Sequence, residues 1–300
     1  MKKILLATSA LVGFAGAAAA EVSLSGYAEM GIKGANGGYD TQFHNDIDVT
    51  FNLSGETDGG LSFGATVDLD EVNSSASLGG TGSVNKSSVW ISGAFGKLTM
   101  GDTDGALDWA VTEIYKGTSL VDDHSTHSGA YWNDGLDGTG NGLVARYEYS
   151  FGDFAVAGSA ELDIGGGNDV LGLGVKWKGD FAGTKVGVGL GYQDNSVNTV
   201  WAISADAAMS NGFSANIGYA DLDTNGTWAG IGLGYASGPL LVQANYGAYD
   251  NGGTTDGWGL VANYDLGGGA VVMAGYGSGD AVSGNSNGTD TWSVGLGLSF

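Results

Sequence analysis

The sequence contains no cysteine and few basic residues, and these shortages exclude several classes of protein. Without cysteine there is neither a disulfide scaffold nor a thiolate metal site. Ten Lys and Arg residues stand against 33 Asp and Glu, and the net charge of −23 argues against binding to nucleic-acid phosphates. So acidic a chain could be disordered, but its 42% hydrophobic and 10% aromatic residues are enough for a packed or lipid-facing surface.

The first residues of the chain have the pattern of a secretory signal. Lys2 and Lys3 precede an apolar run over residues 4–17, and the alanines at 18–20 form a small-x-small cleavage pattern before Glu21. The alternative, a membrane anchor, needs about 20 apolar residues. We therefore expect residues 1–20 to be a signal peptide and residues 21–300 to form the exported domain.

After this run no segment has the periodicity of a helix, and apolar residues instead alternate with small or polar ones. Val22 and Leu24, for example, alternate with Ser23 and Ser25. A period of two is typical of a β-strand with two different faces. Sixteen segments share this pattern, near residues 22–33, 43–54, 61–71, 86–94, 97–101, 142–151, 154–163, 170–178, 184–193, 199–208, 213–221, 227–236, 240–249, 257–266, 270–277 and 290–300.

The connections between these segments alternate in length. Tight turns are expected at 95–96, 152–153, 210–212 and 267–269, and longer polar stretches at 72–85, 250–256 and 278–289. Short turns at one end and long loops at the other are typical of an up-and-down barrel. The prediction is an all-β fold, a 16-stranded antiparallel transmembrane β-barrel with short periplasmic turns and long outer loops.

Alternation alone does not say which face of the barrel meets lipid, because a soluble barrel would alternate as well. Export favours the membrane, as does a strand number that makes the interior too wide for side chains to fill. Aromatic residues also gather near strand ends on the apolar face, as in the girdles of membrane barrels, although ordinary core packing is the alternative. They are Tyr147, Tyr149, Phe151, Tyr192, Trp201, Phe213, Tyr219, Trp228 or its neighbour, Tyr235, Tyr264, Trp292 and Phe300.

Three stretches and the last residue resemble Gram-negative outer-membrane porins of the trimeric, 16-stranded general-diffusion type, nearest the purple-bacterial branch. The stretches are residues 21–28 (EVSLSGYA), 51–61 (FNLSGETDGGL) and 91–102 (ISGAFGKLTMGD), and the chain ends in Phe300. The resemblance implies a homotrimer in the outer membrane of a Gram-negative bacterium, in contact with membrane lipid and lipopolysaccharide.

The resemblance also implies that the third loop, residues 102–141, folds into the barrel and narrows the pore, although a solvated outer loop is the alternative. Its acidic residues are Asp102, Asp104, Asp108, Glu113, Asp122, Asp123, Asp134 and Asp137. The family usually faces this loop with several arginines, whereas this chain has one. The expected basic wall is Lys33, Lys86, Arg146 and His44. We expect a pore that prefers cations.

The predicted activity is passive diffusion of small hydrophilic solutes and ions through water, without a required cofactor and without nucleic-acid partners. A channel selective for a sugar or another nutrient, or a barrel with a structural role, would have the same strand pattern. An outer-membrane hydrolase is disfavoured because the chain has three histidines, His44, His124 and His127, and no Gly-x-Ser-x-Gly elbow.

A metal site is weakly indicated by the acidic loops. His124 and His127 lie near Asp122 and Asp123, but no third strong zinc ligand is placed beside them. Calcium suits the many carboxylate oxygens of the acidic loops better, and its individual ligands cannot be named from sequence.

Overall fold

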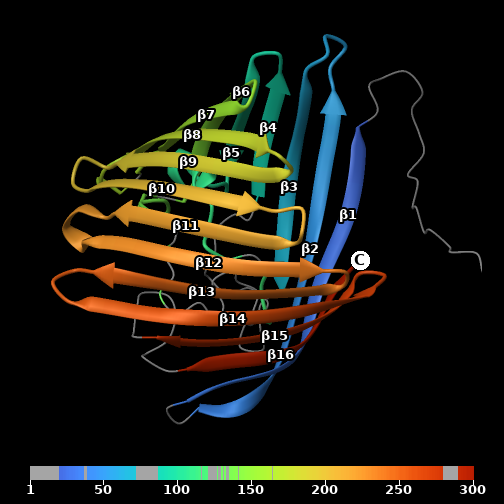
Figure 1. Cartoon of the computed structure of the whole chain (residues 1–300). Coiled ribbons are helices and arrows are strands. Elements are labelled where there is room, and N and C mark those ends of the chain that lie inside the picture. The colour runs from blue at the N-terminus through green and yellow to red at the C-terminus, as the bar shows by residue number, and fades with distance from the viewer. Residues whose placement is uncertain are drawn as a thin grey trace, which may run out of the picture.

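The computed structural model describes residues 20–36, 39–71, 87–115, 117–120, 127, 130, 132, 135–140, 142–163, 165–279 and 290–300, so the predicted signal peptide lies almost wholly outside it. Within these residues sixteen antiparallel strands close into one barrel (Figure 1). The strands are β1 (Glu21–Ala35), β2 (Tyr39–Glu56), β3 (Ser62–Glu71), β4 (Ser87–Gly93), β5 (Gly96–Gly101), β6 (Val144–Phe151), β7 (Phe154–Glu161), β8 (Val170–Phe181), β9 (Thr184–Asp194), β10 (Thr199–Ala208), β11 (Phe213–Asp221), β12 (Thr227–Ser237), β13 (Leu240–Asp250), β14 (Thr254–Gly267), β15 (Ala270–Gly279) and β16 (Thr291–Ser299).

The predicted fold class, strand number and strand order are confirmed. The largest shift of a boundary is at β2, which begins at Tyr39 rather than near residue 43. Its hydrogen-bonded pairing with β1 continues through Lys33 and Gln42 to Ala35 and Tyr39, although the apolar alternation has already faded there. Pairing, and not side-chain polarity, sets where this strand begins.

The two ends of the barrel differ as expected. At one end the connections are short, including the two-residue turns at 152–153, 182–183 and 238–239. The other end carries the long connections 72–86, 102–143 and 280–289, but also three-residue connections at 36–38 and 251–253. The longer stretch expected at 250–256 was therefore wrong, because β13 and β14 extend into it. The long loops are therefore confined to part of the rim.

The ring is closed by β1 and β16, whose paired residues run from Tyr27 with Ser299 to Ala35 with Thr291. Beyond this ladder Gly26 and Phe300 bond to each other in both directions, with N···O distances of 3.3 and 2.8 Å. Closure leaves no strand edge with unsatisfied backbone groups, which the interior of a bilayer does not tolerate.

The apolar face of each strand points outward. On β8 the side chains of Leu171 and Leu173 are 58% and 64% exposed, whereas the alternating Gly172 and Gly174 are buried. A soluble barrel would bury the leucines instead. None of the described helices is long and apolar enough to cross a membrane.

The predicted outward orientation of one aromatic residue was wrong. Trp228 is only 4% exposed, and its Nε1 donates a hydrogen bond to the carbonyl of Ala130 inside the barrel at 2.9 Å. The reason is its register, because Trp228 is paired with Ala220, which is also buried inside.

A charge on the outer face should destabilise the barrel. Val175 lies near the middle of β8, is 42% exposed and points outward. We expect Val175→Arg to lower the free energy of unfolding in lipid vesicles by about 2–4 kcal/mol, because arginine is poorly solvated at the bilayer midplane. The measurement is the urea midpoint of the vesicle-inserted protein.

The matched control is Ser150→Arg, on the inner face of β6, where the side chain is exposed to the lumen. Its unfolding midpoint should stay close to that of the parent protein. An equal loss in both variants would contradict the outward assignment.

Candidate pore constriction

The connection between β5 and β6, residues 102–143, turns back into the barrel. Its short helix α1 (Ala106–Ala110) packs against β7, β8 and β9, and Figure 1 shows this green segment inside the ring. Leu107, Ile114 and Leu136 of the connection form a buried cluster with wall residues such as Trp228. The barrel therefore has an apolar core of its own, built between this loop and one side of the wall.

The loop backbone lies close to the wall because several wall residues that face loop carbonyl groups are glycines. A Cβ atom at Gly189 on β9 would overlap the carbonyl oxygen of Ala110, and one at Gly232 on β12 would overlap that of Ile114. Gly259 on β14 stands in the same relation to the carbonyl of His127. Any larger residue at these positions would push the loop toward the open part of the lumen.

Polar side chains of the wall bind the backbone of the loop. The carboxylate of Glu161 accepts hydrogen bonds from the N–H groups of Gly138, Gly140 and Gly142, at 2.9, 3.0 and 2.6 Å. Other wall side chains bond single loop N–H or C=O groups, among them Ser159, Gln193, Ser204, Asn216, Gln243 and Asn263. These bonds satisfy backbone groups that have no strand partner.

The predicted acidic loop residues have different environments. Asp102 and Asp104 are exposed, while Asp108 and Glu113 are half-buried. Asp137 is also half-buried, where it accepts hydrogen bonds from the N–H of Gly105 at 2.8 Å and from Nε2 of Gln193 at 2.5 Å. Asp137 thus fastens the loop. Three of the predicted residues lie outside the described part of the chain: Asp122, Asp123 and Asp134.

The predicted basic residues do not form one cluster. Arg146 on β6 donates to the carbonyl of Asp104 at 2.5 Å, and its Nη1 is 3.7 Å from the carboxylate of the same residue. His44 on β2 instead bonds Glu29 on β1 at 3.0 Å. Lys33 lies on β1, paired with Ser293 on β16, and Lys86 lies outside the described residues.

One further base of the inner wall lies at the constriction loop. It is Lys176 on β8, whose Nζ is 4.1 Å from the ring centre of Trp109 in α1. The register of β8 and the position of α1 bring Lys176 to this place. On β2 and β3 the inner wall is acidic and includes Asp46, Asp48 and Asp68.

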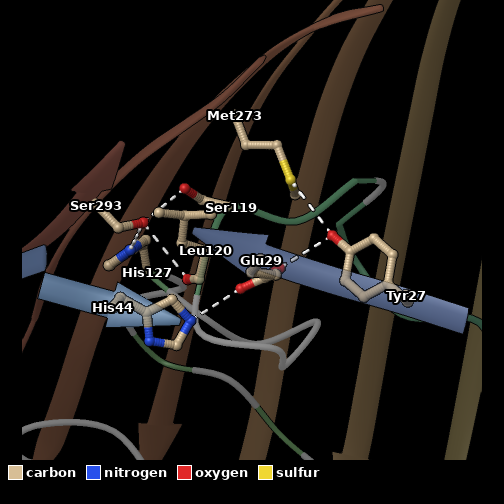
Figure 2. Close-up of polar contacts among 8 residues, drawn as sticks. All are labelled: Tyr27, Glu29, His44, Ser119, Leu120, His127, Met273 and Ser293. Carbon is tan, nitrogen blue, oxygen red and sulfur yellow. Dashed lines mark hydrogen bonds and ion pairs between the residues drawn. The ribbon is translucent and has the colours of Figure 1, made fainter. Parts of the chain in front are cut away.

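The far part of the loop is attached to the barrel seam by a polar cluster (Figure 2). The ring of His127 bonds Thr291 through Nδ1 and Ser293 through Nε2, each at 2.8 Å. Ser119 is 2.6 Å from the hydroxyl of Ser293. All of these contacts reach β16 or the loop itself, so they hold the loop across the barrel from α1.

Neither a catalytic triad nor a metal centre emerges from these side chains. The second ring nitrogen of His127 meets a hydroxyl, whereas a serine hydrolase requires a carboxylate there. Over the described part of the chain, no three His, Cys, Asp or Glu side chains gather as metal ligands. His124 lies outside that part.

A closed 16-stranded barrel with an apolar exterior and a loop folded into a polar lumen defines a membrane channel. The comparisons agree, because the model of the Gram-negative porin family matches residues 7–300. The chain belongs to this family, and it is an outer-membrane porin.

Two kinds of relatives support this. A Rhodobacter capsulatus porin is 38% identical over 142 residues, a stretch that covers 46% of this chain and 44% of that porin, or somewhat under half of either. A porin structure refined at 1.8 Å is 25% identical with a TM-score of 0.72, covering 93% of this chain and all of that one. A mutant of Rhodopseudomonas blastica porin, 20% identical with a TM-score of 0.70 and the same coverage, shares the fold.

The attachment of the constriction loop to the barrel wall should weaken at low pH. Burial lowers the pKa of His127 to about 4, from 6.5. The undocked loop therefore binds a proton more readily, and docking is lost progressively as the pH falls from about 6.5 to about 4, by up to about 3 kcal/mol. We expect larger current fluctuations of single channels over this range.

The matched variant is His127→Asn, because His127 has a φ of 60° and asparagine tolerates this left-handed conformation. It retains hydrogen-bonding groups but does not titrate. Carboxylates that titrate in the same pH range affect the current fluctuations of both the parent protein and the variant. The difference between the two pH profiles therefore reports on His127 alone. Identical pH profiles would contradict the assignment.

Proposed function

We propose that this porin forms a water-filled, cation-preferring pore for the passive diffusion of small hydrophilic solutes and ions. The observation that carries the proposal is the distribution of charge around the remaining lumen. Asp48 and Asp68, half-buried on the inner wall of β2 and β3, add to the exposed acids of the loop, Asp102 and Asp104. Charged rings of one sign raise the local concentration of the opposite ion.

The bases of the wall offset this field only in part. Arg146 is engaged by Asp104 and Glu148, with an Nε to Oε2 distance of 3.5 Å to the latter, so part of its charge is neutralised. Diffusion of solutes through water forms no covalent intermediate and needs no cofactor. Calcium at the acidic outer loops, lipopolysaccharide contacts and cleavage of residues 1–20 on export remain predictions.

Cation preference should depend on the acidic wall. We expect the double variant Asp48→Asn with Asp68→Asn to reduce the potassium-to-chloride permeability ratio by roughly fivefold at low salt, on the basis of about 1 kcal/mol for a charge near the ion path, and by less at high salt. The measurement is the reversal potential of the reconstituted channel in a potassium chloride gradient.

Asp58→Asn, at the exposed turn between β2 and β3, is the control, because it removes a charge outside the strand wall. It should leave the ratio nearly unchanged. A parent channel that prefers chloride would overturn the proposed selectivity. Liposome swelling with neutral sugars tests the pore itself, since a general porin gives a smooth size cut-off and a selective channel favours one sugar.

We also propose that the chain assembles as a homotrimer through the outer faces of β1–β5. The described side chains on these faces include no Trp or Tyr, whereas such rings line the outside of β6–β16. They are Tyr147, Tyr149, Trp177, Tyr192, Trp201, Tyr219, Tyr235, Tyr246, Trp258, Tyr264, Tyr276 and Trp292. Trp and Tyr anchor a surface at the edge of the lipid, and a surface without them suits contact with another chain.

Cross-linking can test this assembly cleanly, because the chain has no cysteine of its own. Val89 on β4 is 62% exposed and Leu171 on β8 is 58% exposed. We expect Val89→Cys to yield dimers and trimers with a bifunctional maleimide, and Leu171→Cys to remain monomeric on denaturing gels. The reverse pattern, or none with either variant, would contradict the proposed face.

A further inference from the structure

A group of charges lies at the short-turn end of the lumen, next to the constriction loop. Lys178 on β8 and Asp206 on β10 are both paired with Gly187 on β9, which lies between them. Asp180 and Lys185 form the next inward-facing pair toward the turn. Positive and negative side chains therefore both lie next to Gly187 on the inner face of the wall.

These residues enclose a hollow of about 430 Å³, which also includes Asp153 at the turn before β7. Gly187 is its floor, since a Cβ atom there would meet the carboxylate of Asp206. Adjacent strands are about 4.8 Å apart, so the backbones of Lys178 and Asp206 are about 10 Å apart across the glycine. The space between them suits a small molecule with two charged ends. We call this space the Gly187 hollow.

The described charged groups of the hollow form no ion pairs with one another. Within the described part of the chain, no hydrogen bond or ion pair holds the ammonium group of Lys178 or Lys185. Asp180 accepts the N–H of Gly183 at 2.9 Å, and Asp206 receives only a long bond of 3.4 Å from the hydroxyl of Thr112. Both ammonium groups and part of the carboxylate capacity remain for a ligand.

The contact with Thr112 also fixes where the hollow lies along the channel. Thr112 follows α1 in the constriction loop, and its N–H donates to Ser204 of β10 at 2.7 Å. Asp206 lies two residues further toward the turn on the same inner face. The hollow therefore begins directly below the loop, on the path between the constriction and the short-turn mouth.

We propose that the Gly187 hollow is a transient binding site for small zwitterions that carry a carboxylate and an ammonium group, the class to which α-amino acids belong. The carboxylate binds Lys178 and Lys185, and the ammonium binds Asp206. A simple anion would meet three carboxylates there, and a simple cation two lysines, so only a molecule with both charges is matched. This inference rests on the proposed pore. Binding at exposed charges is weak, as passage through a channel requires.

The experiment titrates single channels in planar bilayers with glycine, and uses acetate, methylammonium and neutral glycolamide as comparators. Glycine should lower the conductance with saturation, and the three comparators should not. Lys178→Gln and Asp206→Asn should each raise the half-saturating concentration about threefold or more, as expected for the loss of one charged contact. Gly187→Leu, which fills the hollow, should abolish the effect.

Lys97→Gln is the matched control, because Lys97 on β5 lies over the ring of Trp90 at 5.2 Å, away from β8–β10. It removes the same charge and should leave the glycine titration unchanged. An effect of acetate or methylammonium equal to that of glycine would overturn the proposal, as would a titration that is linear or unaffected by Lys178→Gln and Asp206→Asn.

Direct binding separates this inference from the proposed function. The relaxation of carbon-13 glycine is measured by NMR with the detergent-solubilised parent protein and with Lys178→Gln. Binding by a protein that gives no conductance would refute the pore and keep the site. Normal conductance without glycine binding would refute the site and keep the pore.

Discussion

Backbone hydrogen bonding in the absence of water is the constraint on which the whole structure depends. A strand in hydrocarbon must pair on both sides, so the first strand has to find the last, and β1 and β16 do so over nine residue pairs from Tyr27 with Ser299 to Ala35 with Thr291. Closure then makes the two faces unequal. One face is left for lipid, and the other encloses a space too wide to fill with wall side chains.

The constriction solves the same problem inside the ring. Its backbone has no strand partner, and it satisfies polar groups with side chains of the wall on which it lies, such as the Glu161 carboxylate and the Gln193 amide. Glycines at positions such as Gly189 and Gly232 allow this contact, because a side chain there would overlap the loop backbone. The high glycine content of the chain, 58 residues, thus has a structural use beyond turns.

Local patterning was enough to predict the barrel, because the period of two and the turn signals act within a few residues. It was not enough to place side chains relative to one another across strands. Trp228 looked like a girdle residue until its pairing with Ala220 put it inside, and His44 looked like part of a basic wall although Glu29 holds it on the seam side. Lys176 was not connected with the constriction, because neither its register nor the position of α1 follows from alternation. Register is a long-range property that a single sequence encodes only weakly.

The contact between the constriction loop and the wall also has a consequence for the order of assembly. The loop precedes β6 in the chain, yet it contacts strands as late as β16. Ser119 of the loop and Ser293 of β16, which are hydrogen-bonded, are 174 positions apart. Contacts of such separation form late. The loop can therefore take its final position only once β16, the last strand of the chain, is in place.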